Sequence, residues 1–256
     1  MKKEYQLEKQ GVLSLYTGKA EIEFFDEVLS TNITAAQSEV QTNTVFIAKR
    51  QSGGKGRFDR KFYSREGGIY LSYLYKENLP LNEIKFVTPC AAVAVAKTLE
   101  KRGFSPKIKW VNDIYLNSKK ICGILSESKI SSSGASSVIV GIGINVNTES
   151  FPCELADKAS SLFLESGKKY DLNGFVADLI SVLDDLYDEI RRKTFLEEYR
   201  RRSLINGKTL LFKGKEYVCL GIDDDARLIL QNADEQLRFS VGEVSISANG
   251  YVYDVN

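Results

Sequence analysis

Histidine is absent from this chain of 256 residues. Its absence excludes Ser-His-Asp and Cys-His nucleophilic sites, HExxH zinc sites and every histidine general base. If the chain is an enzyme, its chemistry must therefore depend on the positioning of reactants and on electrostatics. Carboxylates, lysines, arginines or a metal ion would have to supply those charges.

The chain also has little net charge and no long apolar run. Its formal charge is +1, so no global field draws it to DNA or to an anionic membrane, and any anion binding must be local. The segment Met1–Gln6 lacks the apolar core of a signal peptide, and no stretch approaches the length of a membrane span. We therefore expect a cytoplasmic protein that binds neither DNA nor a membrane.

Cysteine is scarce, and no two cysteines form a CxxC pair. All of them lie in apolar runs or beside a proline, which predicts buried, reduced thiols in a reducing compartment. The four are Cys90, Cys122, Cys153 and Cys219. An apolar content of 43% and a charged content of 27% are typical of a globular protein with one sizeable core.

The hydrophobic pattern changes character near Asn206. Residues 1–20 are polar and weakly patterned. Strands are then predicted at 21–25, 45–51, 69–75, 107–110, 114–116, 119–127 and 137–146, and helical stretches at 30–40, 84–102 and 171–202. Short period-two strands follow at 209–213, 216–221, 227–231, 237–240 and 243–247. The pattern predicts an α+β fold, with a central mixed sheet flanked by helices in residues 1–206 and a small barrel in 207–256.

A glycine-rich basic segment, Gln51–Phe62, lies between two predicted strands. Its three glycines let the backbone approach a ligand closely, while Lys55, Arg57, Arg60 and Lys61 bring four positive charges within seven residues. Such a loop suits a small anionic ligand, most simply a phosphate chain, although solvated loops of this composition without a function are also common. The whole connection is about 17 residues long, which favours a ligand lid.

The segment Lys109–Asp113 places a cation, an aromatic ring, an amide and a carboxylate at a strand end. It is either a polar turn between strands or part of a nucleotide site. In the second case Asp113 would help to hold Mg²⁺ and Lys109 would balance phosphate charge.

Three further segments have both a structural and a functional interpretation. Ser30-Thr31-Asn32 either caps a helix or contacts a small ligand. Lys120 is either a solvated lysine or a ligand contact, and Gly123 after it would let a ligand lie against the strand. Asn145 either caps its strand or presents its amide to a base edge or a ribose.

Taken in order, these segments resemble one family, the bacterial biotin protein ligases. The resemblance covers residues 24–247. It is carried by Ser-Thr-Asn at 30–32, Gln-x-x-Gly-Lys-Gly-Arg-x-x-Arg-Lys-Phe at 51–62, Lys-Trp-x-Asn-Asp-Ile at 109–114, Lys-x-x-Gly-Ile-Leu-x-Glu at 120–127 and Gly-Ile-Gly-Ile-Asn-Val-Asn at 141–147. It implies a class II synthetase-like catalytic domain of the biotin/lipoate ligase type and an SH3-like C-terminal barrel.

The resemblance implies an ATP-dependent ligase that uses Mg²⁺ and works in two steps. Biotin's carboxylate attacks the α-phosphate of ATP to give biotinyl-5′-AMP, and a lysine of a carboxylase's biotin carboxyl-carrier domain then attacks that anhydride. The alternatives are a biotin or biotinyl-AMP sensor without turnover, and a lipoate or octanoyl transferase of the same fold. A homodimer and a monomer are both compatible with the composition.

The resemblance also assigns roles to residues. Arg57, Lys120, Lys109 and Asp113 are the expected catalytic residues, with Asp113 the expected Mg²⁺ contact. Biotin contacts are expected from Ser30, Thr31, Asn32, Gln51, Gly54, Lys55, Gly56, Arg57, Lys120 and Gly123. ATP contacts are expected from Arg57, Arg60, Phe62, Asn112 and Asn145, with Phe62 over the adenine.

The chain departs from the family pattern at three positions. Lys55 replaces an arginine and loses bidentate geometry. Asp59 replaces a glycine and adds negative charge to the loop, and Val111 replaces the proline of Lys-Trp-Pro-Asn-Asp. Members that repress transcription carry an N-terminal winged helix, whereas the first predicted core strand here starts at Glu21. We therefore expect a ligase without operator binding.

Overall fold

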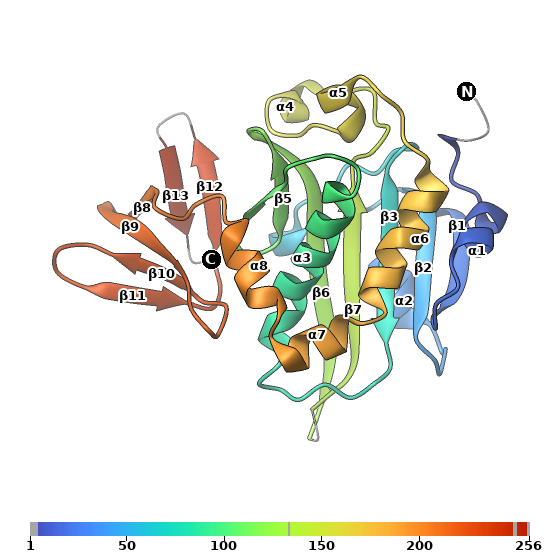
Figure 1. Ribbon diagram of the computed structural model, residues 1–256, viewed down its shortest axis with the longest axis horizontal. Helices are drawn as coiled ribbons and strands as arrows, with labels where there is room; N and C mark the ends of the chain where they lie inside the picture. Colours follow the sequence, from blue (N-terminus) through green and yellow to red (C-terminus); the bar gives the residue numbers. More distant parts are fainter. Residues whose placement is uncertain (1–4, 133, 248–249, 255–256) are drawn as a thin grey trace.

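A mixed β-sheet is the framework of the main body (Figure 1). The computed structural model describes residues 5–132, 134–247 and 250–254. Within them the sheet has seven strands in the order β1-β2-β3-β7-β6-β5-β4. The bounds are β1 Glu21–Val28, β2 Thr44–Gln51, β3 Ile69–Tyr75, β4 Lys107–Lys109, β5 Asp113–Leu116, β6 Lys119–Ser131 and β7 Gly134–Ile144. β1 is parallel to β2 and the other neighbours are antiparallel, which confirms the predicted mixed sheet.

The position of each strand in the sheet follows its composition. β3 is buried along its whole length and lies between β2 and β7, as expected for a strand covered on both faces. β1 carries four carboxylates in eight residues and forms an edge of the sheet, where charged side chains discourage pairing with another chain.

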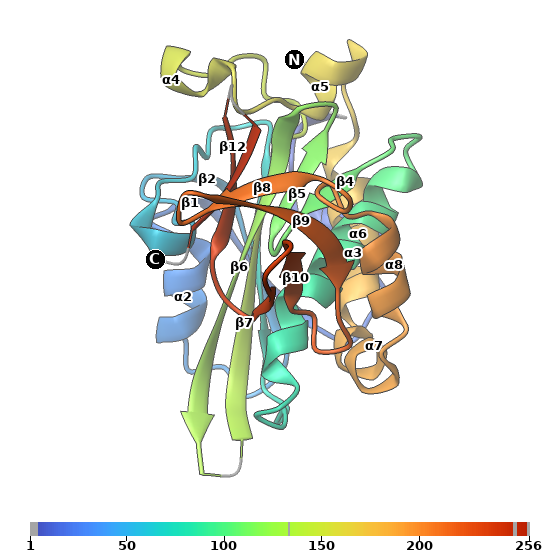
Figure 2. The same ribbon diagram turned by 90° about the vertical axis from the view of Figure 1, so that its left-hand side faces the viewer.

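Helices cover both faces of this sheet (Figure 2). α2 (Thr31–Gln37) lies on one face, against β2, β3 and β7. α3 (Val87–Glu100) lies on the other face, after the short turn η3 (Ile84–Phe86), and packs against α6 (Leu172–Leu183). The small alanine and valine side chains of α3 are all buried, so this helix can lie close to the strands. The site described below is on the α2 face.

The helical stretch predicted at 171–202 is wrong as one element, because it consists of three helices. α6 is followed by α7 (Leu186–Arg192) and α8 (Phe195–Arg201). The first break lies at Asp184, whose carboxylate accepts hydrogen bonds from the hydroxyls of Tyr16 and Tyr73. The second lies at Lys193, which has a left-handed φ of 55°. The apolar stripe is continuous in sequence although the backbone turns twice.

Three short helices were not predicted. α1 (Lys9–Leu15) packs on α6, and α4 (Cys153–Ala156) and α5 (Leu162–Ser166) follow β7. Helices this short carry too few residues for a periodic pattern. The expectation of buried thiols is wrong for Cys153, which is exposed at the start of α4, whereas Cys90, Cys122 and Cys219 are buried.

A second sheet forms the barrel-like C-terminal unit. Among the described residues it has six strands, ordered β11-β10-β9-β8-β13-β12, so the expectation of five strands missed one. The bounds are β8 Thr209–Phe212, β9 Lys215–Ile222, β10 Leu228–Gln231, β11 Gln236–Phe239, β12 Glu243–Ser247 and β13 Gly250–Asp254. The division of the chain at residue 206 stays a prediction. No described helix combines the length and the apolarity that crossing a bilayer requires.

An ion-pair cluster on α8 predicts how acid destabilises the fold. Hydrogen bonds from Arg202 and then Arg201 lower the pKa of Glu198 to about 2, against about 4.3 in an unfolded chain. Because the pKa is lower in the folded state, the ionised Glu198 stabilises the fold. This stabilisation is complete above the unfolded pKa and is lost as the pH falls through the folded pKa. We therefore expect the difference in Tm between the wild type and Glu198→Gln to be largest near neutral pH and to shrink steadily as the pH falls toward 2.

Thermal unfolding followed by circular dichroism across this pH range measures that difference. Glu197→Gln is the matched control, because it removes the same charge from an exposed neighbour on the same helix. A Tm difference for Glu198→Gln that does not change with pH would contradict the assignment.

Candidate functional site

A polar cluster forms where α2 begins and β2 ends. The Thr31 amide donates to Gln51 Oε1 over 2.8 Å, and Gln51 Nε2 donates to Ser64 Oγ over 2.9 Å. Ser30 occupies the N-cap position of α2, as the structural interpretation of this segment expects, but its side chain makes no capping hydrogen bond. Ser30, Thr31 and Asn32 are all buried and line a cavity. The cluster offers amide and hydroxyl groups to a small polar ligand.

Asn32 is held in place from three sides. Its Nδ2 donates to Leu125 O (3.2 Å) and to Glu127 Oε2 (2.6 Å), while Ser72 Oγ donates to its Oδ1 over 2.6 Å. A Cβ atom added at Gly141 would lie 2.0 Å from Asn32 Oδ1, so this side chain lies directly on the bare backbone of β7.

Two paired glycines continue the floor of the cavity. Gly123 on β6 is opposite Gly143 on β7. Added Cβ atoms would lie 3.2 Å and 2.6 Å, respectively, from ring carbons of Phe62. The Phe62 ring therefore lies over this part of the sheet, with Lys120 Nζ 6.0 Å from the ring centroid. Its stacking on an adenine, and the position of Gly123 beneath biotin, stay predictions.

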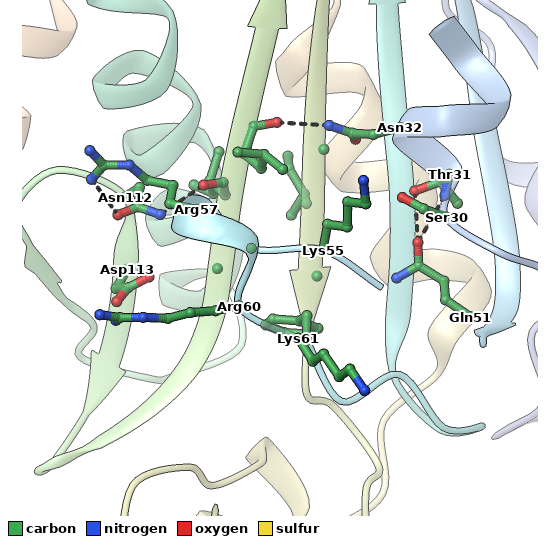
Figure 3. A pocket seen from close by; sticks show the side chains of 18 of the residues that line it. Ser30, Thr31, Asn32, Gln51, Lys55, Arg57, Arg60, Lys61, Asn112 and Asp113 are labelled. Atoms are coloured by element: carbon green, nitrogen blue, oxygen red, sulfur yellow. Dashed lines mark hydrogen bonds between the residues drawn. The ribbon is translucent and has the colours of Figure 1, made fainter. Parts of the chain in front are cut away.

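The basic loop folds back on itself above this floor. The Gly56 amide donates to Arg60 O (2.7 Å), and the Phe62 amide donates to Gly54 O (2.8 Å). The tight turn between them contains Phe58 in the left-handed region, with φ of 55°. Figure 3 shows the result: Ser30, Thr31 and Gln51 lie on one side of the pocket, Arg57, Asn112, Asp113 and Arg60 lie on the other, and Lys55 lies between them. The side chain of Asp59 lies outside the described residues.

Asp113 is the centre of a buried charge cluster. Its Oδ1 is 2.6 Å from Lys120 Nζ and its Oδ2 is 3.2 Å from Lys109 Nζ. Burial alone would raise the pKa of Asp113, but the two ammonium groups outweigh it, so this pKa lies below its usual value. Asp113 therefore stays ionised at neutral pH and fixes both lysines at the pocket wall.

Two asparagines complete the far side of the pocket. Arg57 Nη1 lies 3.5 Å from Asn112 Oδ1, and Asn112 Nδ2 donates to Ile124 O over 2.8 Å. Asn145 Nδ2 donates to Ser160 O over 3.0 Å, while its buried Oδ1 has no hydrogen-bond partner among the described residues. Asn145 also lines a cavity, and the contact of its amide with a ligand stays a prediction.

Two adjoining cavities bring almost all the predicted residues together. The first, of about 140 Å³, is lined by the predicted biotin and ATP contacts except Gly54 and Asn145. The second, of about 550 Å³, is lined by Lys109 and Asn145. Phe62, Asp113 and Lys120 line both. Gly54 lies behind the first cavity, where an added Cβ would be 2.9 Å from Gln51 Nε2.

The surroundings of Asp113 bear on the expected magnesium site. Both oxygens of Asp113 already contact ammonium groups, and no group of three acidic, histidine or cysteine side chains able to hold a metal occurs among the described residues. A resident metal cage therefore does not fit this site. The site fits an ion that is coordinated mainly by phosphate oxygens and water, as is usual for Mg²⁺ with nucleotides. The contact between Asp113 and Mg²⁺ stays a prediction.

The sequence did not point to three residues that the structure places in the site. Ser72 is fully buried beneath α2 and lies 2.7 Å from Thr31 Oγ1. Ser64 links Gln51 to the loop through Phe62 O. Glu243, from the barrel, lines both cavities. A polar residue inside the otherwise apolar or aromatic strand Ile69–Tyr75 was a usable signal for Ser72, whereas nothing local marked Glu243.

Comparisons with known proteins agree with this arrangement. The model of the biotin/lipoate A/B protein ligase family matches residues 26–145. The bifunctional ligase/repressor BirA of Bacillus spizizenii is 36% identical over 223 residues, which cover 82% of this chain and 69% of the relative. The biotin–[acetyl-CoA-carboxylase] ligase of Mycobacterium tuberculosis is 27% identical, over 78% of this chain and 77% of the relative.

A solved structure extends the similarity to the whole fold. The biotin protein ligase from Aquifex aeolicus, in complex with biotin and ATP, is similar with a TM-score of 0.75 and 29% identity. The match covers 87% of this chain and 97% of that one. The chain belongs to the biotin/lipoate A/B protein ligase family. Within that family its relatives are biotin protein ligases, which confirms the resemblance inferred from the five sequence segments.

Proposed function

We propose that this protein is an ATP-dependent biotin protein ligase that joins biotin to a lysine of a carboxylase's carrier domain. One observation carries the proposal: a small cavity with a polar end adjoins a larger cavity, and Lys120 lines both. The polar end, formed by Ser30, Thr31 and Gln51, suits the ureido group of biotin. The cationic junction suits a carboxylate that must approach a phosphate.

In the first step a carboxylate oxygen of biotin attacks the α-phosphorus of ATP, and pyrophosphate leaves. In the second step the carrier lysine's amine attacks the carbonyl carbon of biotinyl-5′-AMP, and AMP leaves. Neither step requires a nucleophile from the protein, in agreement with a chain that has no histidine. Orientation of the reactants can supply about 7–11 kcal/mol of the barrier.

The chain's own residues contribute charge and position. Arg57 and Lys120 lie on the pocket wall, where they can neutralise charge that develops on the carboxylate and the α-phosphate. Asp113 keeps Lys120 and Lys109 in place through the buried ion pairs. Mg²⁺ enters as the ion of the Mg–ATP substrate, where it offsets phosphate charge.

The proposed acceptor is the biotin carboxyl-carrier domain of a carboxylase. Two relatives, from Paracoccus denitrificans and Mycobacterium tuberculosis, are named biotin–[acetyl-CoA-carboxylase] ligases. The larger cavity supports the same interpretation, because its roughly 550 Å³ offer room beside the junction for an incoming lysine side chain.

A cysteine-dependent acyl transferase is the rival within this fold. Cys122 is adjacent in sequence to Gly123 but is fully buried and does not line either cavity. Burial raises its pKa well above the usual value, so the nucleophilic thiolate is scarce at neutral pH. The geometry therefore favours adenylate chemistry over transfer through a cysteine.

Incubation with biotin, ATP, Mg²⁺ and a carrier domain tests the proposal. We expect pyrophosphate release that depends on biotin, and an intact carrier mass that increases by one biotinyl group. A protein that binds biotin in a calorimeter but releases no pyrophosphate would be a sensor. Transfer of lipoate or octanoate in place of biotin would identify the rival activity.

Removal of the Ser72 hydroxyl is expected to weaken biotin binding. Ser72→Ala leaves the buried Asn32 Oδ1 without its hydroxyl donor and removes one contact of Thr31 Oγ1, and an unsatisfied buried group costs about 1–3 kcal/mol. We expect the Kd for biotin, measured by isothermal titration calorimetry, to rise between roughly fivefold and a hundredfold.

Ser126→Ala is the matched control for this prediction. Ser126 is also on the central sheet, but its hydroxyl contacts Thr88 on α3 and it does not line the cavity. Equal losses of biotin affinity in both variants would show that Ser72 acts only through general stability.

A further inference from the structure

The turn that leads into β12 brings barrel residues into the pocket. Glu243 lines both cavities, and its side chain is only 15% exposed. Figure 1 shows β12 on the side of the barrel that faces the main sheet. The barrel therefore supplies a carboxylate to a site whose other lining residues, apart from Ser245, lie within residues 30–159.

Both arginines of the basic loop contact this turn. Arg60 Nη1 forms an ion pair with Glu243 Oε1, and Arg57 Nη1 donates to Gly242 O over 3.1 Å. Glu243 Oε1 also lies 4.0 Å from Lys109 Nζ. One short turn of the barrel thus contacts two cations of the loop and lies within reach of a third on β4.

The turn itself is rigidly built. Gly242 has φ of +130°, and an added Cβ would lie 2.4 Å from the Tyr253 hydroxyl and 2.8 Å from Asp254 O. That hydroxyl donates to Val241 O over 2.6 Å, and the Tyr253 ring packs 6.2 Å from the ring of Trp110. Trp110 directly follows Lys109, so the same packing fixes the turn relative to the charge cluster.

A carboxylate between a guanidinium and an ammonium group makes the contacts that a phosphate oxygen would make. We propose that Glu243 is a positioning residue, which holds the basic loop through Arg60 until the phosphates of the nucleotide displace it. The displacement of Glu243 by phosphate rests on the proposed function, whereas the contact by which Glu243 holds the loop does not. The barrel thereby has a role in adenylation: it orders the loop before nucleotide binds and releases it when phosphate takes over the cations.

The exchange of partners has a measurable consequence. Glu243→Gln removes the charge but keeps a hydrogen-bonding side chain of the same size, so Arg60 loses most of its attraction to the turn. With no nucleotide added, we expect the amides of Gly56 and Phe62, which close the loop, to exchange hydrogen roughly tenfold faster than in the wild type. With biotin and Mg–ATP added, we expect wild type and variant to exchange at the same rate.

Hydrogen exchange with mass spectrometry of peptides spanning residues 54–62 provides both measurements. Glu216→Gln is the matched control, because Glu216 is an exposed carboxylate on β9 of the same barrel and lines neither cavity. The double variant Arg60→Gln/Glu243→Gln should exchange no faster than either single variant, because both remove the same ion pair.

Two outcomes would overturn the inference. Unchanged exchange in nucleotide-free Glu243→Gln would mean that the turn does not hold the loop. Faster exchange both with and without biotin and Mg–ATP would mean that the contact persists in the complex and is only structural. Pyrophosphate release by the wild type is measured in the same samples, so a failure of the proposed function is seen separately from a failure of the loop contact.

Discussion

Replacement of Arg57 by alanine is expected to slow adenylate formation by about a hundredfold to a thousandfold. The guanidinium reaches across the pocket wall to Asn112 and to the barrel turn at Gly242. From there it can contact an anion bound in the smaller cavity, which it lines. Removal of an oriented donor to the charge that develops in a transition state has an effect of this size. Pyrophosphate release in a pre-steady-state assay measures it.

Two variants test the specificity of this effect. Arg57→Lys keeps the charge but loses the planar fork, so we expect an intermediate rate. Arg65→Ala removes an exposed arginine at the end of the same loop that does not line either of the two cavities, and we expect its rate to match the wild type. A near-normal rate for Arg57→Ala in a folded protein would refute the role of Arg57.

Lys120→Ala is expected to have a comparably large effect, and one that depends on pH. Lys120 lines both cavities and is the closer of the two ammonium groups on Asp113. Burial raises the pKa of Asp113, and the two lysines lower it. Without Lys120 only Lys109 counteracts burial, so the pKa of Asp113 rises. We expect adenylate formation to fall by about a hundredfold or more at neutral pH. We also expect a further decline at acidic pH that the wild type does not show.

Lys119→Ala is the matched control, since this neighbouring lysine contacts Ala156 O and does not line either cavity. The measurement is the pH profile of pyrophosphate release for the wild type and both variants. Parallel profiles for the wild type and Lys120→Ala would contradict the coupling between Lys120 and Asp113.

The positions of most strands along the chain, and the segments proposed for the site, could be predicted because their signals are local. Glycines within the strand at 137–146, cations in a long loop, and an Asn-Asp pair at a strand end each predict a feature from neighbouring residues alone. The structure brings these segments together: Gly141 supports Asn32, Gly143 supports Phe62, and Asp113 contacts Lys120. Such contacts follow once the strand order β3-β7-β6-β5 is given.

The features that sequence reasoning missed depend on contacts between distant segments. Glu243 lies 183 residues from its partner Arg60, and nothing near Glu243 indicates the pairing. The break between α6 and α7 coincides with Asp184, which is 168 residues from Tyr16. The apolar periodicity of 171–202 reports which side chains are buried, but it does not report where the backbone turns.

Contacts between distant segments also explain how the chain manages without the family's proline at Val111. A proline there would restrict the turn through its own ring, but here tertiary contacts fix the same segment. The Tyr199 hydroxyl donates to Val111 O over 3.0 Å, and Trp110 Nε1 donates to Ala226 O over 3.1 Å.

The departure at Lys55 has a different explanation. Lys55 is exposed and forms a backbone bridge with Lys61. This fits a position that works through its backbone and its charge.

In the proposed reaction, adenylation proceeds by positioning and charge neutralisation, with no covalent bond to the protein. The most direct test is the intact mass of the protein under denaturing conditions, after one turnover with biotin and Mg–ATP and no carrier. We expect an unchanged protein mass, with about one equivalent of biotinyl-5′-AMP recovered in the small-molecule fraction. A covalent biotinyl or adenylyl adduct on the protein, formed as fast as pyrophosphate is released, would contradict it.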